Sequence, residues 1–356
     1  MKYVALKDVC KINMGQSPDS SSYNENGEGI PFFQGNADFG ERYPVTRVWC
    51  NAPTKIAQSE DILISVRAPI GALNYAKEKC CIGRGLAAIT PDKSKVSLEF
   101  VYWFLKGKNA ELKSKGTGST FKAISKKILE EILIPDVGFD KQHEYAQMLE
   151  KIYVIIQTRK QELQKLDELI QSRFVEMFGD PVANDKEWTT LPLEEACKTI
   201  VDCPHSTPSY TTENTGFMCI RTSIVKKNKI LWDDIEYIPE DEFIKRIQRK
   251  KPEIGDVVYT REGAILGIAA IIDRECNVAL GQRSMLLSPD ANKCLSEFLC
   301  VAMNCDSFLD NALKGIAGSA SPHINVGDIK SFKMIIPPIE LQNQFADFVV
   351  STDKSK

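Results

Sequence analysis

The clearest pattern of apolar and polar positions in the chain is a helical one at residues 140–178. Neither proline nor glycine interrupts this segment, and its apolar residues recur at three- and four-residue spacing, at Leu149, Ile152, Ile156, Leu163, Leu166 and Ile170. Such spacing places them in one narrow stripe, like the a and d positions of a coiled coil. A helix of this length would span about 55–60 Å, and Gly179-Asp180-Pro181 would end it. We therefore expect an outlying spacer helix; the alternative is an ordinary helix packed on its own domain.

The segments on either side of this helix repeat one another in the same order. The similar pairs are EDILISVRAPIG (60–71) with GDVVYTREGAILG (255–267), IGRGLAAITPDKSKVSLEF (82–100) with LGQRSMLLSPDANKCLSEF (280–298), GTGSTFKAIS (116–125) with GIAGSASPHIN (315–325), and ILIPDVGFDKQHEYA (132–146) with IIPPIELQNQFA (335–346). Each half reads as strands and turns, a short helix at 97–113 or 294–314, a Gly-Ser loop, and a strand ended by proline. This pattern predicts two mixed α/β (α+β) domains related by an internal repeat.

The repeat divides the chain into four predicted segments. The first domain comprises residues 1–136, the long helix 137–180 and the second domain 181–338. Residues 339–356 begin a second helix of the same kind, which breaks off after about a dozen residues. Either a partner chain completes the apolar stripe of the long helix, with self-association as one way to do so, or the chain is shortened.

Composition narrows the class of protein. The chain has 356 residues, of which 43% are hydrophobic and 26% charged, with a net charge of −3, as in ordinary globular proteins. The longest apolar run, at 264–272, is too short to cross a bilayer, and no signal peptide opens the chain, so we expect a cytoplasmic protein. Eleven cysteines without a C-x-x-C pair, and three histidines, predict no metal site. The acidic balance argues against a protein that coats nucleic acid by charge alone.

Both halves close in the same way. Each ends in a Gly-Ser loop, an Ile-Pro strand end and a helix start with Gln and Ala four residues apart, at Gln142 with Ala146 and at Gln342 with Ala346. Together with LIQSRFVEMFGDP at 169–181, these features resemble the specificity subunit of type I restriction-modification systems. The resemblance implies that each half is a target-recognition domain that reads one part of a gapped site in double-stranded DNA. It also implies that long helices run antiparallel as a coiled-coil spacer and dock methyltransferase subunits, with restriction subunits completing the complex.

The resemblance places catalysis in other chains. S-adenosylmethionine, ATP and Mg are then expected on partner subunits, and this chain would bind no cofactor. The sequence agrees, because Ile336 precedes Pro337-Pro338 and Val182 follows Asp180-Pro181, so neither site makes the N-P-P- or D-P-P-aromatic motif of an adenine methyltransferase. The loop GTGSTFKA also lacks the GxxxxGK[ST] spacing of a nucleotide-binding loop. We therefore expect no catalytic residue.

Planar side chains at strand ends are the candidates for base contacts. Arginine pairs with guanine edges, and asparagine or glutamine with adenine edges. The candidates beside glycine-rich strand ends are Arg67, Arg84, Arg261, Gln282 and Arg283, with Gln34, Asn36 and Arg221 as further ones. Arg67 and Arg261 are expected at corresponding places in the two halves. For each residue the alternative is a solvated loop charge.

The two Gly-Ser loops are the candidates for contacts with the DNA backbone. Glycine lets backbone N–H groups approach a phosphate, and hydroxyl groups and cations bind phosphate without sequence preference. The candidate residues in and beside the loops are Lys115, Thr117, Ser119, Lys122, Lys314, Ser319, Ser321 and His323. The equal alternative is a structural turn that packs each domain onto its long helix.

A protein of a different class also fits this organisation. It would be a truncated, non-reading scaffold derived from such a subunit, with two domains that bind proteins. The short segment 339–356 is the observation that favours it.

Overall fold

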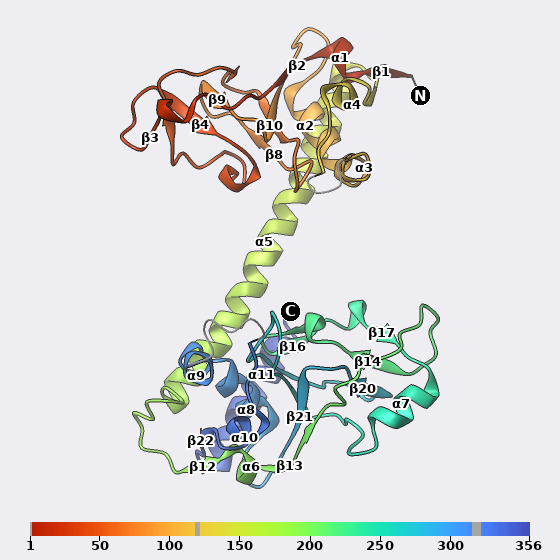
Figure 1. Cartoon of the computed structure of the whole chain (residues 1–356). Helices are drawn as coiled ribbons and strands as arrows, with labels where there is room; N and C mark the ends of the chain where they lie inside the picture. The colour runs from red at the N-terminus through yellow and green to blue at the C-terminus, as the bar shows by residue number, and fades with distance from the viewer. Residues whose placement is uncertain (1, 118–121, 315–321) are drawn as a thin grey trace. The chain divides into compact units, whose positions relative to one another are not determined.

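Strands and short helices gather into two compact units in the computed structural model, which describes residues 2–117, 122–314 and 322–356 (Figure 1). Unit 1 is Met1–Thr158 and unit 2 is Arg159–Lys356. The boundary falls inside helix α5, Phe139–Phe178, which has 40 residues. The helix predicted at 140–178 is therefore confirmed, while the bounds of the four predicted segments remain a prediction.

Unit 1 combines an antiparallel sheet with a mixed one. The antiparallel sheet contains, in spatial order, β2 (Cys10–Met14), β10 (Leu86–Pro91), β7 (Ile62–Ser65) and β8 (Leu73–Tyr75). The mixed sheet contains β3 (Tyr23–Asn24), β5 (Trp49–Cys50), β4 (Ile30–Phe33), β9 (Cys80–Ile82) and β6 (Ile56–Ala57), and β1 (Tyr3–Ala5) pairs separately with β11 (Leu133–Pro135). The helices of this unit, apart from its part of α5, are α1 (Leu6–Val9), α2 (Leu98–Gly107), α3 (Asn109–Ser114) and α4 (Lys126–Glu130), with 3-10 turns at Ser20–Ser22 and Asn36–Asp38.

Unit 2 repeats this plan. Its antiparallel sheet contains β13 (Cys197–Asp202), β21 (Ser284–Pro289), β18 (Val257–Thr260) and β19 (Ala269–Ile271), and β12 (Thr190–Pro192) pairs with β22 (Lys333–Ile335). The smaller sheets contain β17 (Glu236–Tyr237), β14 (Met218–Ile220) and β20 (Val278–Leu280), and β15 (Val225–Lys226) with β16 (Lys229–Ile230). The helices are α6 (Leu193–Ala196), α7 (Glu240–Arg246), α8 (Ser296–Asn304), α9 (Asp306–Ala312), α10 (Val326–Lys330) and α11 (Ile339–Asp353), with 3-10 turns at Thr222–Ile224 and Trp232–Asp234.

The central strands are mostly apolar, and both of their faces are buried. In β7, Ile62 and Ile64 pack in the same cluster as Phe100 of α2, whereas Leu63 faces the opposite side and packs with Phe33. Side chains alternate across a strand, so a strand covered on both faces reads as a continuous apolar run. Strand β18 has the same arrangement, and the predicted repeat of two mixed domains is confirmed.

The short helices predicted at 97–113 and 294–314 are each divided in two. Lys108 leaves the helical conformation between α2 and α3, with ψ near 4°. Cys305 adopts an extended conformation, with ψ of 140°, between α8 and α9. The sequence shows one apolar face across both helices, so the break is visible only in the backbone.

Within unit 2, α11 runs antiparallel to the end of α5. Phe178 lies 5.5 Å from Phe345 between ring centroids, and the Arg173 guanidinium lies 5.9 Å from the ring of Phe348. Further along, Lys356 Nζ contacts Asp167 Oδ1 at 2.6 Å. Increasing residue numbers on one helix thus meet decreasing numbers on the other. The predicted antiparallel pairing of the long helices is confirmed for this stretch.

The part of α5 in unit 1 keeps an apolar stripe facing solvent. Its large apolar side chains are 38–61% exposed at Tyr145, Met148, Leu149, Ile152, Ile155 and Ile156. Ile170, at the other end of the predicted stripe, is buried in the core of unit 2. The described residues therefore cover the stripe only toward the end of the helix.

Cysteines behave as small apolar residues in both units. All eleven lie in the described part of the chain as free thiols, and each is buried except Cys276, which is half-buried. Burial, with the nearby Asp92 carboxylate, raises the pKa of the Cys10 thiol to about 12. No helix in the described ranges combines the length and the apolarity needed to cross a membrane.

Candidate nucleic-acid interface

Each unit contains a parallel strand pair, and these two are the parallel pairings found among the described strands. Strand β4 pairs with β9 in unit 1, and β14 pairs with β20 in unit 2. Two parallel strands end at the same edge of their sheet, so the residues that follow them come together there. The candidate base-contacting residues other than Arg67 and Arg261 lie at these two edges.

In unit 2 the edge is held together by a close approach of two backbones. The N–H of Gly281 donates to the carbonyl of Ile220 at 2.8 Å. A Cβ atom on Gly281 would lie 2.9 Å from that carbonyl oxygen, closer than side-chain carbons normally approach. Glycine therefore lets Arg221 and Gln282 leave their strands side by side.

These residues line a polar hollow of about 260 Å³, together with Thr207, Tyr210, Thr222, Ser223 and Arg283. Arg221 donates to Glu236 Oε1 at 2.9 Å, and its guanidinium lies 5.4 Å from the ring of Tyr210. The Nε atom of Arg221 is buried and has no hydrogen-bond partner among the described residues. Gln282 Oε1 accepts from the Thr207 hydroxyl at 3.3 Å. The hollow thus presents donors from planar groups that are already held in place.

Unit 1 presents its own planar groups at the equivalent edge. The N–H of Gly83 donates to the carbonyl of Phe33 at 2.8 Å, and both Gln34 and Arg84 are exposed. Asp38 fixes the turn after β4, because its carboxylate accepts from the N–H of Gln34 at 2.7 Å. Asn36 begins the 3-10 turn that carries this aspartate.

Arg67 and Arg261 do not occupy corresponding places, contrary to the expectation from sequence. Residue Arg67 forms a bridge with Ala123, whereas Glu262 forms the equivalent bridge with His323. Arg261 therefore lies one position before the residue that corresponds to Arg67. A shift of one position turns a side chain to the other face of the strand. Arg67 is accordingly exposed, and Arg261 is buried at 5% exposure.

The Arg261 guanidinium forms ion pairs with acidic groups of its own unit. Its Nε donates to Asp202 Oδ1 at 2.9 Å, and another nitrogen contacts Glu262 Oε1 at 2.8 Å. His205 Nε2 lies 3.1 Å from the second oxygen of Asp202. This arrangement neutralises the arginine in the interior, while its assignment to DNA remains a prediction, as do those of the other candidates.

The described candidates around the first Gly-Ser loop lie at its base. Thr117 and Ala123 exchange backbone hydrogen bonds of 3.0 and 2.9 Å, and Lys122 between them is exposed. Lys115 contacts Glu111 at 2.7 Å, and Lys108 contacts the other oxygen of that carboxylate. Their hydrogen bonds lower the pKa of Glu111 to about 2. Lys115 is therefore partly neutralised.

The second loop has a similar base. Lys314 donates to Asn311 Oδ1 at 3.2 Å, and the bridge between Glu262 and His323 closes the other side. Ser119, Ser319 and Ser321 lie outside the described residues.

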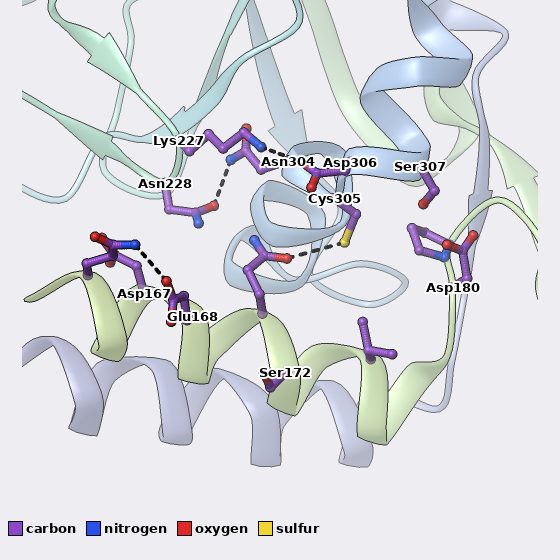
Figure 2. A pocket seen from close by; sticks show the side chains of 14 residues that line it. Asp167, Glu168, Ser172, Asp180, Lys227, Asn228, Asn304, Cys305, Asp306 and Ser307 are labelled. Atoms are coloured by element: carbon purple, nitrogen blue, oxygen red, sulfur yellow. Dashed lines mark hydrogen bonds and ion pairs between the residues drawn. The ribbon is translucent and has the colours of Figure 1, made fainter. Parts of the chain in front are cut away.

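A larger hollow in unit 2 was not predicted from the sequence. It has about 950 Å³ and lies between α5, the β15–β16 turn and the α8–α9 junction, where Asp167 and Glu168 line one side (Figure 2). On the opposite side Lys227 pairs with Asp306 at 2.7 Å, and the buried Asn304 donates to Asn228 at 2.7 Å. Its carboxylates would repel phosphate. The sequence pattern gave no signal for this hollow.

Comparison with known proteins supplies the family. A family model described as type I restriction modification DNA specificity domain matches residues 1–168 and 185–356, one match in each half. A putative type I restriction enzyme MjaX specificity subunit from Methanocaldococcus jannaschii is 47% identical over 157 residues, which cover 44% of this chain and 37% of that protein. The MjaIX specificity subunit of the same organism is 24% identical over 379 residues, covering 97% of this chain and 84% of that one.

A solved structure has a related fold. The crystal structure of the type I restriction-modification system S subunit from M. genitalium matches with a TM-score of 0.52 at 16% identity, covering 99% of this chain and 89% of that one. At this identity the likeness concerns the fold. The MjaX match, in contrast, spans less than half the length of that relative.

Proposed function

The chain belongs to the type I restriction-modification DNA specificity family, and from this premise we propose that it reads a gapped, two-part site in double-stranded DNA. In this proposal each unit reads one part of the site. The chain directs adenine methyltransferase subunits, and through them restriction subunits, to that site. Catalysis, S-adenosylmethionine, ATP and Mg belong to those partners, and this chain binds no cofactor.

The observation that carries the proposal is the repeated edge at the ends of the parallel strands. Exposed planar side chains lie there in both units: Gln34 and Arg84 in unit 1, and Arg283, beside the half-buried Gln282, in unit 2. Arginine can donate two hydrogen bonds to the edge of guanine in the major groove, and glutamine can donate one and accept one at the edge of adenine. A scaffold that bound proteins through these edges would not need planar donors at the same edge of both units.

The exposed apolar stripe on α5 supports docking of a methyltransferase subunit. Six large apolar residues between Tyr145 and Ile156 follow one face of the helix in unit 1. An exposed apolar patch of this kind marks a protein interaction site more often than a DNA contact. We assign this stripe to the methyltransferase partner.

Mapping of methylated adenines in the host genome tests the proposed function. The genome is compared between cells with and without the gene for this chain, in the presence of the partner methyltransferase. The expected result is that one gapped, two-part methylated sequence disappears with the gene. An unchanged methylation pattern would instead support the non-reading scaffold.

A further inference from the structure

The two units carry different side chains at equivalent positions of the same edge. The first landmark is the hydrogen bond of 2.8 Å that joins Gly83 to Phe33 in unit 1 and Gly281 to Ile220 in unit 2. The equivalent pairs that follow from it are Gln34 with Arg221, Arg84 with Gln282, and Gly85 with Arg283.

A second landmark confirms this register from the other side. The N–H of Val66 donates to the carbonyl of Gly85 at 2.8 Å, and the N–H of Arg261 donates to the carbonyl of Arg283 at 3.0 Å. The following strands then begin at the same place, because Leu86 pairs with Ser65 and Ser284 pairs with Thr260. The hydrogen-bond register of the two edges therefore matches residue by residue.

We propose that these three positions determine which base pairs each unit requires in its part of the DNA site. The inference rests on the proposed function, and it names the residues that set specificity. Unit 1 offers the amide of Gln34, the guanidinium of Arg84 and no side chain at position 85. Unit 2 offers the guanidinium groups of Arg221 and Arg283 and the amide of Gln282. Since arginine selects guanine and glutamine selects adenine, the two parts of the site differ in sequence, and unit 2 requires a guanine opposite Arg283.

Position 85 cannot carry a side chain in unit 1. A Cβ atom on Gly85 would lie 2.4 Å from the carbonyl oxygen of Gln34. Arg283 avoids this conflict with a φ of 73°, a conformation that residues other than glycine seldom adopt. The left-handed backbone sends its side chain outward, where it is exposed and has no hydrogen bond or ion pair to any described residue. A strained residue whose side chain is unused within the chain is typical of a binding site.

The neighbouring side chains are held in position before any ligand arrives. Glu236 and Tyr210 fix the guanidinium of Arg221, and the Thr207 hydroxyl holds Gln282. Such supporting contacts keep a recognition group within the narrow range of geometry that it needs.

Arg283→Gly separates base recognition from folding. Glycine accepts a φ of 73° without strain, so the variant should fold at least as well as the parent. In cells that contain the partner methyltransferase, we expect the methylated sequence to lose its guanine requirement at one position of one part. Discrimination at that position should fall by roughly 5- to 150-fold. Glu187→Gly is the matched control, because Glu187 also has a positive φ, of 58°, and is exposed in a turn outside this edge.

Exchange of residues between the units gives an independent arm. Arg84→Gln copies the unit 2 residue into unit 1, and Gln282→Arg copies the unit 1 residue into unit 2. Each variant should change the preferred base in one part of the site and leave the other part as it was. Methylated sequences that stay unchanged in all three variants would overturn the proposal. A folded variant that methylates all sequences equally poorly would also overturn it, because a residue that contacts only DNA phosphates gives that result.

The parent chain separates this inference from the proposed function. If cells with the parent chain show no gapped methylated sequence, the proposed function itself has failed. If the parent shows the sequence and the variants do not alter its bases, only the assignment of the three positions has failed.

Discussion

Gln142 and Gln342 make the same set of hydrogen bonds at the start of their respective helices. Gln142 Oε1 accepts from the N–H of Ser97 at 2.8 Å, and Gln342 Oε1 accepts from the N–H of Leu295 at 2.9 Å. The amide nitrogen of each also donates to two backbone carbonyls, those of Lys95 and Val137 in unit 1 and of Lys293 and Pro337 in unit 2. Both side chains are buried, so each ties the beginning of its helix to the loop before α2 or α8.

Removal of this amide should destabilise unit 2. Gln342→Met leaves buried backbone groups of Leu295, Lys293 and Pro337 without partners, and the expected loss is about 2–4 kcal/mol in the free energy of unfolding. Urea unfolding measures the change. The control Gln344→Met lies on the exposed face of the same helix and should have little effect. Equal losses in the two variants would contradict the structural role of Gln342.

The two strand-end arginines should differ sharply in their effect on stability. Arg261→Ala leaves Asp202 and Glu262 without their buried cation, and the cost should be about 3–5 kcal/mol. Arg67→Ala removes an exposed side chain and should change stability by about 0.5 kcal/mol or less. Thermal unfolding of both variants tests this difference. A large loss for Arg67→Ala would show that the offset between the two residues is wrong.

The lysines beside the first Gly-Ser loop should bind DNA without regard to sequence. Lys115→Ala combined with Lys122→Ala should weaken binding to all duplexes alike. The slope of log affinity against log salt concentration should also fall by the equivalent of about two phosphate contacts. Titration of cognate and random duplexes over a range of salt concentrations measures both effects. A loss confined to the cognate duplex, or no loss, would leave the loop as a structural turn.

Glu111 should restrain the same lysines over a wide pH range. Hydrogen bonds from Lys108 and Lys115 lower its pKa from 4.5 to about 2. The carboxylate is therefore charged at every pH above 4.5, and it loses its charge only as the pH falls toward 2. Glu111→Gln should therefore strengthen binding to random duplexes, and the gain should be the same at pH 5 and pH 8. A gain that disappears at pH 5 would mean that the parent carboxylate is already protonated there.

The apolar stripe on α5 should matter for assembly and not for folding. Ile152→Ser combined with Ile155→Ser alters exposed positions, so the melting temperature and the DNA affinity of the chain alone should stay close to those of the parent. Affinity for the methyltransferase subunit should fall by about tenfold or more. Lys151→Ser, an exposed change elsewhere on the same helix, is the control. Unchanged assembly would direct the search for the docking surface elsewhere.

Sequence periodicity was sufficient for the repeat and for the long helix. The stripe from Leu149 to Ile170 marks α5 because helical spacing is a local property. The repeated order of similar segments marks the two units for the same reason. These features do not depend on which distant segments meet in space.

Features that depend on distant pairing were not visible in the sequence. Nothing local shows that β14 lies parallel to β20, so the edge that joins Arg221 to Gln282 required the structure. The one-residue offset of Arg261 was missed because the pattern V-R-A resembles T-R-E by letter, whereas the bridges align Arg67 with Glu262. The larger hollow in unit 2 also required the structure, because it depends on the side chains that α5 places opposite the α8–α9 junction.

Ten of the eleven cysteines are fully buried, so labelling of the chain should favour one position. A thiol reacts with a maleimide dye as its thiolate, and burial suppresses both access and ionisation. Cys276 is the cysteine that is not fully buried, and it lies just before β20, the strand that leads to Gln282 and Arg283. A dye attached there would test DNA binding at unit 2 without any engineered cysteine, and its fluorescence would follow that unit alone.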